Sequence, residues 1–239
     1  MALFVKHTPC PKCGSRDNRA VYSDGSSWCF GCHHSEPPSG ESFNPYTVAK
    51  MSSLPSLPEL STHFPQHVVQ WLSKYDISVE EALKHGWKYN SKYDQLVFLY
   101  CGEDGRVVCS QARNFAPQAK RKYFNEGSVA SVLPLFYVLG SEKRSRSVVV
   151  VEDAVSAAKI SRVSDAIPCL GSHLPKNKIS ALRLLNYEEM VVWLDGDKYR
   201  EALQIAEQAR LVGFSTKVVH TELDPKEHSV EEIKEKLNG

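Results

Sequence analysis

The sequence predicts an α/β protein: a Rossmann-like parallel sheet, preceded by a mixed α+β part rich in basic residues and by an N-terminal β zinc ribbon. Three observations support this prediction. From Ser147 onward, short apolar runs alternate with amphipathic segments, which is typical of a parallel sheet with helices on its faces. Before that point, two apolar runs flank a Glu103-Asp104-Gly105 turn and indicate a β-hairpin. Near the N-terminus, two Cys-x-x-Cys pairs have the spacing of a zinc site.

Composition places the chain among ordinary globular proteins. Hydrophobic residues make up 42% and charged residues 24% of its 239 residues, a length that suits one large domain or two smaller ones. No apolar run approaches the ~20 residues of a membrane span, and the first residues lack the long apolar segment of a signal peptide. We therefore expect a reducing cytoplasmic setting and no membrane partner.

The charges are unevenly distributed, although the net charge is only +1. Between positions 106 and 146 the acidic residues are Glu126 and Glu142, whereas the basic residues are Arg106, Arg113, Lys120, Arg121, Lys122, Lys143, Arg144 and Arg146. The stretch from Glu222 onward is instead acid-rich. A basic segment of this kind is compatible with contacts to phosphates.

The predicted ribbon contains Cys10, Cys13, Cys29 and Cys32. Asp24-Gly25 between the two pairs is a strong hairpin signal, so we expect β-strands to join the ligand turns. A unit this short cannot bury enough apolar surface to fold alone, and one structural Zn²⁺ would supply the missing stability. Free thiols or disulfides are the alternative, which the spacing and a reducing compartment disfavour. Four thiolates complete a tetrahedron, so His33 and His34 are expected to be solvated.

Four parts follow from these patterns: residues 1–36 as the zinc ribbon, 37–60 as a flexible linker, 61–146 as the basic part and 147–239 as the part with the parallel sheet. The linker rich in Pro and Ser predicts a tethered ribbon that moves relative to the rest. Residues 64–89 are expected to be helical in two pieces, with Ser78 as the second N-cap and Gly86 as a stop. The hairpin strands are predicted over residues 95–100 and 106–113.

The last part alternates strictly between strands and helices. The expected strands are residues 148–151, 166–170, 190–194 and 215–220, and the expected helices are residues 154–162, 176–185, 199–212 and 230–237. Ligands of an open parallel sheet bind beyond the carboxyl ends of its strands.

Acidic residues stand at two of these strand ends. Glu152 and Asp153 follow one strand, and Asp195-Gly196-Asp197 follows another. Mg²⁺ favours such hard oxygen ligands, usually one or two carboxylates together with substrate phosphates. Aspartates also end strands for solubility, so a lone Asp-x-Asp is weak evidence, but two strand ends in one unit are stronger. If the strand conformation persists through Gly196, Asp195 and Asp197 point to one side.

The order of these features resembles that of DnaG-type bacterial and phage primases. Glu152 after one strand, Gly171 after the next and Asp195-x-Asp197 after a third are similar to the Toprim fold of primases and topoisomerases. The cysteine motif resembles the zinc-binding domain of phage primase–helicases. Lys122-Tyr123-Phe124-Asn125 is similar to a string that precedes Toprim in the family. The resemblance covers nearly the whole chain.

This resemblance implies the synthesis of short RNA primers from NTPs on single-stranded DNA, by Mg-dependent nucleotidyl transfer. It places Glu152 beside one to three Mg²⁺ or Mn²⁺ ions, with a role as general base left open, and makes Asp195 and Asp197 their ligands. Asp153 stays open as a further ligand or as the N-cap of the following helix. The metals would neutralise triphosphate charge and activate a 3′-hydroxyl.

The resemblance also assigns roles to polar residues outside the sheet. The triphosphate and the template backbone would be held by Arg113, Lys120, Arg121, Lys122 and Asn125; template bases would be read by Arg16, Asp24 and Trp28, together with Arg19 and Tyr22. A solvated charge cluster and a ribbon that only packs on the core remain the alternatives. The expected partners are a separate replicative helicase and a DNA polymerase in a bacterial cytoplasm, with a phage origin left open.

The chain departs from the family pattern at its acidic residues. Asp153 replaces a usual Gly, Ser156 stands where an Asp is common, and Lys198 stands where a Gly usually follows the aspartates. The number of acidic metal ligands is therefore open. Asp224-Pro225-Lys226-Glu227 after the last strand provides either another acidic site or a turn.

Two other functions stay open. One is a Toprim nuclease or topoisomerase-like enzyme that cleaves DNA, and the other is a non-catalytic zinc-ribbon replication adaptor with a degenerate Toprim part. The sequence contains no G-x-x-x-x-G-K-[ST] motif of a helicase motor. We therefore expect a stand-alone primase, with any unwinding supplied by a partner.

Overall fold

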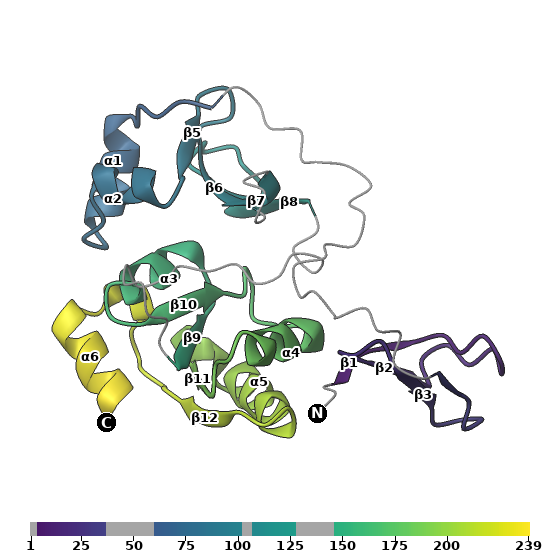
Figure 1. Cartoon of the computed structure of the whole chain (residues 1–239). Helices are drawn as coiled ribbons and strands as arrows, with labels where there is room; N and C mark the ends of the chain where they lie inside the picture. Colours follow the sequence, from purple (N-terminus) through teal and green to yellow (C-terminus); the bar gives the residue numbers. More distant parts are fainter. Residues whose placement is uncertain (1–3, 37–59, 102–106, 128–145) are drawn as a thin grey trace.

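The computed structural model describes residues 4–36, 60–101, 107–127 and 146–239. These residues form three four-stranded sheets, one each in the ribbon, in a middle part and in a C-terminal part (Figure 1). Nearly all of the predicted linker lies outside the described residues, as do the turn of the predicted hairpin and the basic residues Arg106, Lys143 and Arg144. Within the described ranges, no helix combines the length and the apolar character needed to cross a membrane.

The ribbon, residues 4–36, is an antiparallel sheet in the order β1-β2-β3-β4. Its strands are β1 (Phe4–Thr8), β2 (Arg19–Tyr22), β3 (Ser27–Cys29) and β4 (Ser35–Glu36). The hairpin predicted at Asp24-Gly25 is confirmed: Gly25 has φ +80°, and Asp24 Oδ1 accepts a hydrogen bond from the Ser26 amide at 3.0 Å. The sequence did not predict β1, which forms because β2 offers it a pairing edge.

The middle part, residues 60–127, has two helices and an antiparallel sheet in the order β5-β6-β7-β8. Its elements are α1 (Gln66–Ser73), α2 (Val79–Lys84), β5 (Lys88–Asn90), β6 (Gln95–Cys101), β7 (Val107–Asn114) and β8 (Tyr123–Gly127). The predicted cap is confirmed, since the Ser78 hydroxyl accepts from the Glu81 amide at 3.1 Å. The predicted stop is confirmed as well, since Gly86 has φ +75° just after α2. The predicted helical range ran past this stop to Tyr89, which instead belongs to β5 and pairs with Ser61.

The C-terminal part, residues 146–239, is a parallel sheet in the order β10-β9-β11-β12. Its strands are β9 (Ser147–Val151), β10 (Asp165–Pro168), β11 (Glu189–Val192) and β12 (Ser215–Val218). Its helices are α3 (Ala154–Ile160), α4 (Lys176–Leu184), α5 (Tyr199–Leu211) and α6 (Val230–Asn238), with short 3-10 turns η1 (Gly196–Lys198) and η2 (Pro225–Glu227). Each predicted strand and helix is confirmed, with ends within two residues of those expected.

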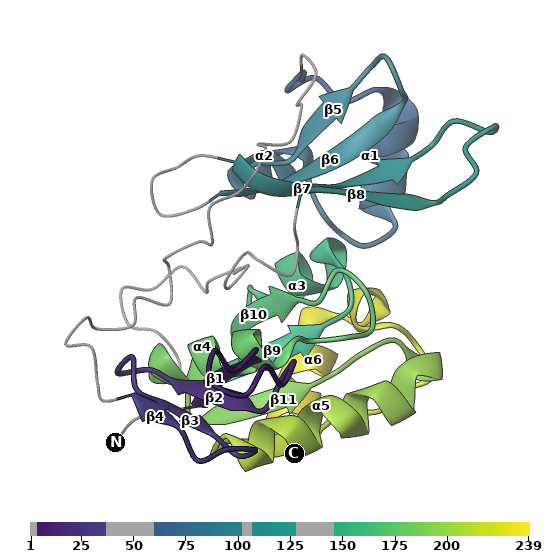
Figure 2. The same ribbon diagram turned by 90° about the vertical axis from the view of Figure 1, so that its right-hand side faces the viewer.

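The two faces of this sheet have different neighbours. Val148 and Val150 of β9 pack with α4 and α5 in one apolar cluster. Val149 and Val151 face the other way, into a cluster that contains α3 and also Trp71, Trp87 and Phe98 of the middle part. A single apolar core therefore runs through the middle and C-terminal parts, which fixes how they face each other (Figure 2).

Arg162, just after α3, ties the two parts together at their surface. Its guanidinium donates to Asp76 Oδ2 at 2.9 Å and to both carboxylate oxygens of Glu81, at 2.9 and 2.5 Å. The Arg162 and Glu81 side chains are only 24% and 21% exposed. Two-oxygen pairing of this kind holds an arginine in one geometry.

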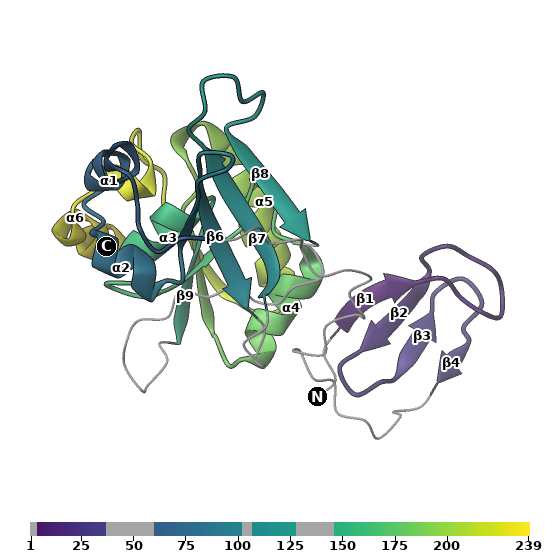
Figure 3. The ribbon, with the colours of Figure 1, turned by 90° about the horizontal axis from the view of Figure 1, so that it is seen from above.

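The ribbon lies against the opposite side of the C-terminal part. Strand β1 contacts α4 (Figure 3), and Phe4 borders a cavity of about 310 Å³ together with Ile179 of α4 and Leu211 of α5. The sequence predicted a ribbon free to move. In the structure it has a contact surface, because Phe4 finds apolar neighbours there.

We expect Arg162→Ala to loosen the joint between the middle and C-terminal parts. The free energy of unfolding should fall by about 1–3 kcal/mol, because the partly buried Glu81 loses its charged partner. Urea unfolding followed by circular dichroism measures this change.

Arg146→Ala is the matched control, since the side chains of the Arg146–Glu188 ion pair are 82% and 55% exposed and should contribute nothing measurable. An unfolding midpoint that Arg162→Ala leaves unchanged would mean that the apolar core alone joins the two parts.

Candidate active site and zinc centre

The four predicted cysteine ligands meet at one point of the ribbon. Their sulfur atoms all lie within 4.8 Å of one another, with 3.7 Å between Cys10 and Cys32 and 3.7 Å between Cys13 and Cys29. Thiolates around a tetrahedral zinc at a Zn–S distance of about 2.3 Å are separated by about 3.8 Å. The arrangement therefore fits one zinc ion, as the spacing predicted.

Backbone turns hold this geometry. Gly14, at φ +69°, lets the chain fold back so that its amide donates to the Cys10 carbonyl at 2.9 Å. Interactions with the Ser15 hydroxyl and amide lower the pKa of Cys13 to about 6. A backbone hydrogen bond at His34 lowers the pKa of Cys32, but burial and the neighbouring thiols raise it to about 12. A cation among the four sulfur atoms would favour the thiolate at all of them. His33 and His34 do not belong to the ligand group, as expected.

The predicted carboxylates Glu152 and Asp195 lie at the ends of neighbouring strands. Glu152 directly follows β9, Asp195 follows β11, and Val150 pairs with Val192 in the ladder between them. The strands themselves are buried, so both carboxylates emerge from apolar surroundings. Glu152 Oε2 and Asp195 Oδ1 are buried and have no hydrogen-bond partner among the described residues.

Burial and mutual repulsion affect the ionisation of both groups. Burial raises the pKa of Asp195 to about 7, with Asp153, Asp224 and Glu152 acting in the same direction. Burial, followed by the charge of Asp153, also raises the pKa of Glu152. Buried carboxylate oxygens without a donor are costly in the ionised form. A divalent cation would supply the missing partner, so the two residues fit a metal site.

Asp197 lies differently from the expectation. The strand conformation does not persist through Gly196; the chain turns into η1 instead. Gly196 is required there, since a Cβ atom would come within 2.7 Å of the Thr221 carbonyl oxygen. The Asp197 side chain is 73% exposed and pairs with Lys198 Nζ at 2.6 Å. Among the described residues, only the four cysteines form a preassembled group of three or more candidate ligands.

Asp153 is the N-cap of α3. Its Oδ1 accepts from the amides of Val155 and Ser156 at 2.8 and 3.0 Å, and its Oδ2 accepts from the Ser156 hydroxyl at 3.2 Å. The same Oδ2 pairs with Lys226 Nζ at 2.9 Å. The structure thus uses Asp153 as the cap that the sequence left open, and both of its oxygens have donors.

The role of Lys226 was not predicted from the sequence, whereas Asp224 had been named in a possible acidic site. Lys226 Nζ lies 2.9, 2.8 and 3.6 Å from carboxylate oxygens of Asp153, Asp224 and Asp195. The signal was the string 224–227, for which an acidic site or a turn was expected. It is both, because Asp224 and Glu227 form the capping box of η2.

Arg113 lies on β7 of the middle part, among aromatic side chains. Its guanidinium carbon is 5.0 Å from the Trp71 ring centre, 5.5 Å from that of Phe115 and 5.2 Å from that of Tyr123. Burial and the charge of Asp153 raise the pKa of Tyr123 to about 12. Tyr123 pairs with Arg113 in the sheet and packs against the apolar cluster that contains α3, so Arg113 lies beside the contact between the middle and C-terminal parts.

Asn125 also connects the two parts. Its side-chain amide donates to the Leu170 carbonyl at 3.5 Å and accepts from Gln111 at 3.0 Å. Leu170 precedes Gly171, whose amide donates to the Glu152 carbonyl at 3.3 Å. Asn125 thus lies near the loop that supports Glu152.

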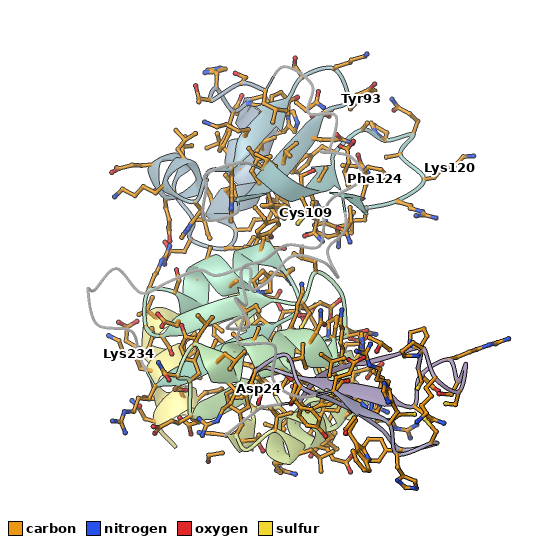
Figure 4. All side chains as sticks on the ribbon, turned by 45° about the vertical axis from the view of Figure 1, so that its right-hand side comes forward. Asp24, Tyr93, Cys109, Lys120, Phe124 and Lys234 are labelled. Atoms are coloured by element: carbon orange, nitrogen blue, oxygen red, sulfur yellow. The ribbon has the colours of Figure 1, made fainter. Side chains whose placement is uncertain are left out.

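Three predicted phosphate-binding residues lie away from Arg113 and Asn125: Lys120, Arg121 and Lys122. They are exposed on the connection between β7 and β8, and Figure 4 shows Lys120 at the outer side of the middle part, near Tyr93 and Phe124. Lys120 and Arg121 line a concave surface of about 770 Å³ with those two aromatic residues. Phe124 and Tyr123 are neighbours on β8, so this surface lies on the face of the sheet that Arg113 does not use.

The candidate template residues of the ribbon are unequally available. Arg16 is exposed, and Trp28 is 36% exposed beside the His33 ring. The Asp24 carboxylate is engaged in the hairpin turn with Ser26. Arg19 is paired with Glu36. Base contacts through Arg16, Asp24 and Trp28 remain predictions.

Comparison with known proteins gives one match in sequence and several in fold. No protein-family model matches the chain. A stretch of 40 residues, 17% of the chain, is 50% identical to a DNA helicase/primase of Enterobacteria phage T3 and spans 7% of that protein.

Two of the similar solved structures cover nearly the whole chain, and a third covers about three quarters of it. The primase fragment of the bacteriophage T7 primase-helicase is 16% identical, with a TM-score of 0.52 over 99% of this chain and 98% of its own. The zinc-binding and RNA polymerase domains of the Aquifex aeolicus primase are 15% identical, with a TM-score of 0.60 over 97% and 78%. A DnaG primase catalytic domain bound to ssDNA is 16% identical, with a TM-score of 0.60 over 74% and 73%. The chain therefore has the fold of DnaG-type primase domains, which confirms the expected fold.

Removing one thiolate should empty the zinc centre. We expect Cys13→Ser to lower the zinc content from about one ion per chain to well below that, because three thiolates and a neutral hydroxyl bind Zn²⁺ poorly. Atomic emission on desalted protein measures the content. Cys169→Ala, at a buried thiol of the C-terminal part, should retain the ion. Wild-type zinc content in Cys13→Ser would exclude Cys13 as a ligand.

Proposed function

We propose that the chain is a DNA primase, which joins ribonucleotides into short primers on single-stranded DNA. The observation that carries this proposal is the pair of buried, unpartnered carboxylate oxygens on Glu152 and Asp195 at adjacent strand ends. Arg113 of the middle part lies 5.2 Å from the centre of the Tyr123 ring, which packs against the apolar cluster shared with the C-terminal part. The fold, shared with DnaG-type primase domains, is consistent with this function.

Glu152 and Asp195 would hold a divalent cation, Mg²⁺ or Mn²⁺, with Asp197 reaching it once its pair with Lys198 opens. Such an ion neutralises triphosphate charge and lowers the pKa of a 3′-hydroxyl. Glu152 would also act as the general base, because a carboxylate of raised pKa can accept the proton of the 3′-hydroxyl. Lys198 would be released to meet the charge of the incoming triphosphate.

Arg113 would orient the triphosphate. The three aromatic rings around its guanidinium fix its position, so little side-chain entropy is lost when it binds a phosphate. Asn125 would hold the loop that supports Glu152. Lys120, Arg121 and Lys122 would contact the template backbone farther away, where exposed cations serve as phosphate contacts.

The ribbon would read the template. A zinc ion bound by the four cysteines would hold β3 in place, next to Trp28 and Phe30, which are 36% and 59% exposed. Exposed aromatic rings are platforms for unstacked bases, and Arg16 offers a cation nearby in the sequence. A solved DnaG catalytic domain of the same fold is bound to ssDNA, which is consistent with such a template.

The wider setting is part of the proposal. NTPs are the proposed substrates, a replicative helicase and a DNA polymerase the proposed partners, and a bacterial cytoplasm the proposed location. The similarity to a phage helicase/primase over 40 residues is compatible with a phage origin. That the chain acts without an attached helicase stays a prediction, as do the part boundaries at residues 36, 60 and 146.

One observation favours a non-catalytic adaptor as the second candidate. Lys226 already neutralises part of the acidic cluster, as a lysine would in a site that has lost its metals. Primer synthesis separates this candidate from a primase, whereas cleavage of labelled DNA without NTPs would favour the nuclease.

Asp195→Ala should abolish primer synthesis while zinc stays bound. We expect a decrease on the order of 100-fold or more, because the cation loses a central ligand. Single-stranded DNA, the four NTPs and Mg²⁺ are incubated with the protein, and the RNA products are sized on a gel. Glu207→Ala, at an exposed acid of α5, should retain full activity. Primers made by Asp195→Ala at the wild-type rate would refute the active-site assignment.

Trp28→Ala should weaken template binding by about tenfold, since stacking on an aromatic ring contributes roughly 1–3 kcal/mol per base. Fluorescence anisotropy with a labelled single-stranded oligonucleotide measures the dissociation constant. Trp28→Phe should lie between the two, and equal zinc content in all three proteins would show that the ribbon is intact. Identical affinities would indicate that the ribbon only packs on the core.

A further inference from the structure

Lys226 occupies the middle of an acidic cluster. Its ammonium lies 2.9 Å from Asp153 Oδ2, 2.8 Å from Asp224 Oδ2 and 3.6 Å from Asp195 Oδ2. The side chain is only 12% exposed. Three carboxylates from three different loops, after β9, β11 and β12, thus converge on one cation that belongs to the chain.

The backbone around Lys226 is held in place. Pro225 stands at the first position of η2, and the capping box of Asp224 and Glu227 closes this short turn. Lys159 of α3 donates from Nζ to the Lys226 carbonyl at 3.1 Å. The ammonium is therefore placed by a fixed turn, which limits the entropy lost when it is confined among carboxylates.

The charges show what the ammonium does. Lys226 Nζ donates hydrogen bonds to carboxylate oxygens of Asp153 and Asp224 at 2.9 and 2.8 Å. An ammonium between two carboxylates is a charge-assisted donor, so Lys226 brings one positive charge into the cluster. The buried Oδ1 of Asp195 and Oε2 of Glu152 have no hydrogen-bond partner among the described residues.

We propose that the Lys226 ammonium replaces one divalent cation, so that the site holds a single Mg²⁺ or Mn²⁺, bound by Glu152 and Asp195, instead of a pair. This inference rests on the proposed function. Paired metal ions in phosphoryl-transfer sites lie about 3.5–4 Å apart and share a carboxylate. Asp195 has that bridging position here, with Oδ2 toward Lys226 and Oδ1 free.

Lys226 is thus a positioning residue for Asp195. Its attraction to Oδ2 holds one oxygen of the Asp195 carboxylate, while Oδ1 has no donor, and neither has Glu152 Oε2 after the neighbouring strand. A lysine that only joined the loop to α3 would have the same contacts with Asp153 and Asp224. Cation stoichiometry distinguishes the two roles, because only a charge substitute excludes a second ion.

The experiment counts Mn²⁺ ions bound to the zinc-loaded, full-length chain, from the electron paramagnetic resonance signal of free Mn²⁺ during titration. We expect one Mn²⁺ on the wild type, two on Lys226→Met and one on Lys226→Arg, which keeps the charge. Lys234→Met, at an exposed lysine of α6, is the matched control and should bind one. Glu152→Gln in the wild-type background should lower the affinity for the single Mn²⁺ ion.

Thermal unfolding keeps the test decisive if Lys226→Met folds poorly. Without Mn²⁺, the three carboxylates that have lost their shared cation should lower the Tm, and Mn²⁺ should raise the Tm far more than it does for the wild type. A variant that Mn²⁺ does not restore, or that binds a single Mn²⁺ with wild-type affinity, would overturn the inference. So would two ions on the wild type.

These outcomes are distinct from a failure of the proposed function. If the wild type and Lys226→Met bind one and two Mn²⁺ ions but no RNA is made, the cation count stands and the primase proposal falls. If the wild type makes primers but Lys226→Met still binds one ion, the primase proposal stands and the role of Lys226 falls.

Discussion

Carboxylates of Glu152, Asp153, Asp195 and Asp224 converge at the carboxyl edge of the parallel sheet, where partial burial strengthens their mutual repulsion. The strands that carry the first three end in fully buried valines and tryptophan, so the chain cannot separate these groups without opening its core. The fold must compensate them locally. A helix N-terminus compensates Asp153, and Lys226 compensates Asp153 and Asp224. One buried carboxylate oxygen of Glu152 and one of Asp195 are left without a hydrogen-bond donor among the described residues. These two oxygens mark the candidate metal site.

The shared apolar core packs the middle part against the C-terminal part, which carries the candidate metal site. Trp71 and Phe98 of the middle part pack in the same cluster as Val149 and Val151 of β9, so Arg113 is placed relative to the sheet by close packing. If the two parts were joined only by a hinge, the position of Arg113 relative to the sheet would depend on the conformation of the linker. The ribbon is bound differently: its stability depends on the four thiolates, and its contact with the rest is a small apolar surface around Phe4. Template reading would therefore depend on the four-cysteine cluster of the ribbon, and nucleotide transfer on the apolar core shared by the other two parts.

Two residues at which the sequence departs from the Toprim pattern that it resembles, Asp153 and Ser156, compensate each other. Asp153 stands in place of a glycine, and an aspartate at position 156 would add a negative charge within one helical turn of it. Ser156 instead donates its hydroxyl to Asp153 Oδ2 at 3.2 Å. Lys226 supplies the remaining positive charge. Residues 153, 156 and 226 thus form one electrostatic unit, and a change at one of them should be tolerated only with changes at the others.

Local patterns in the sequence were sufficient to predict the four-cysteine cluster and each helix and strand of the C-terminal part, because cysteine spacing and hydrophobic periodicity are short-range signals. They also placed Glu152 and Asp195 at strand ends, since apolar runs stop abruptly there. β1 and β8 were missed because a short strand forms only where a neighbour pairs with it. The environment of Arg113, the turn at Asp197 and the convergence on Lys226 depended on tertiary structure. Each joins residues far apart in the chain, and neither charge nor burial across such distances can be read from local sequence.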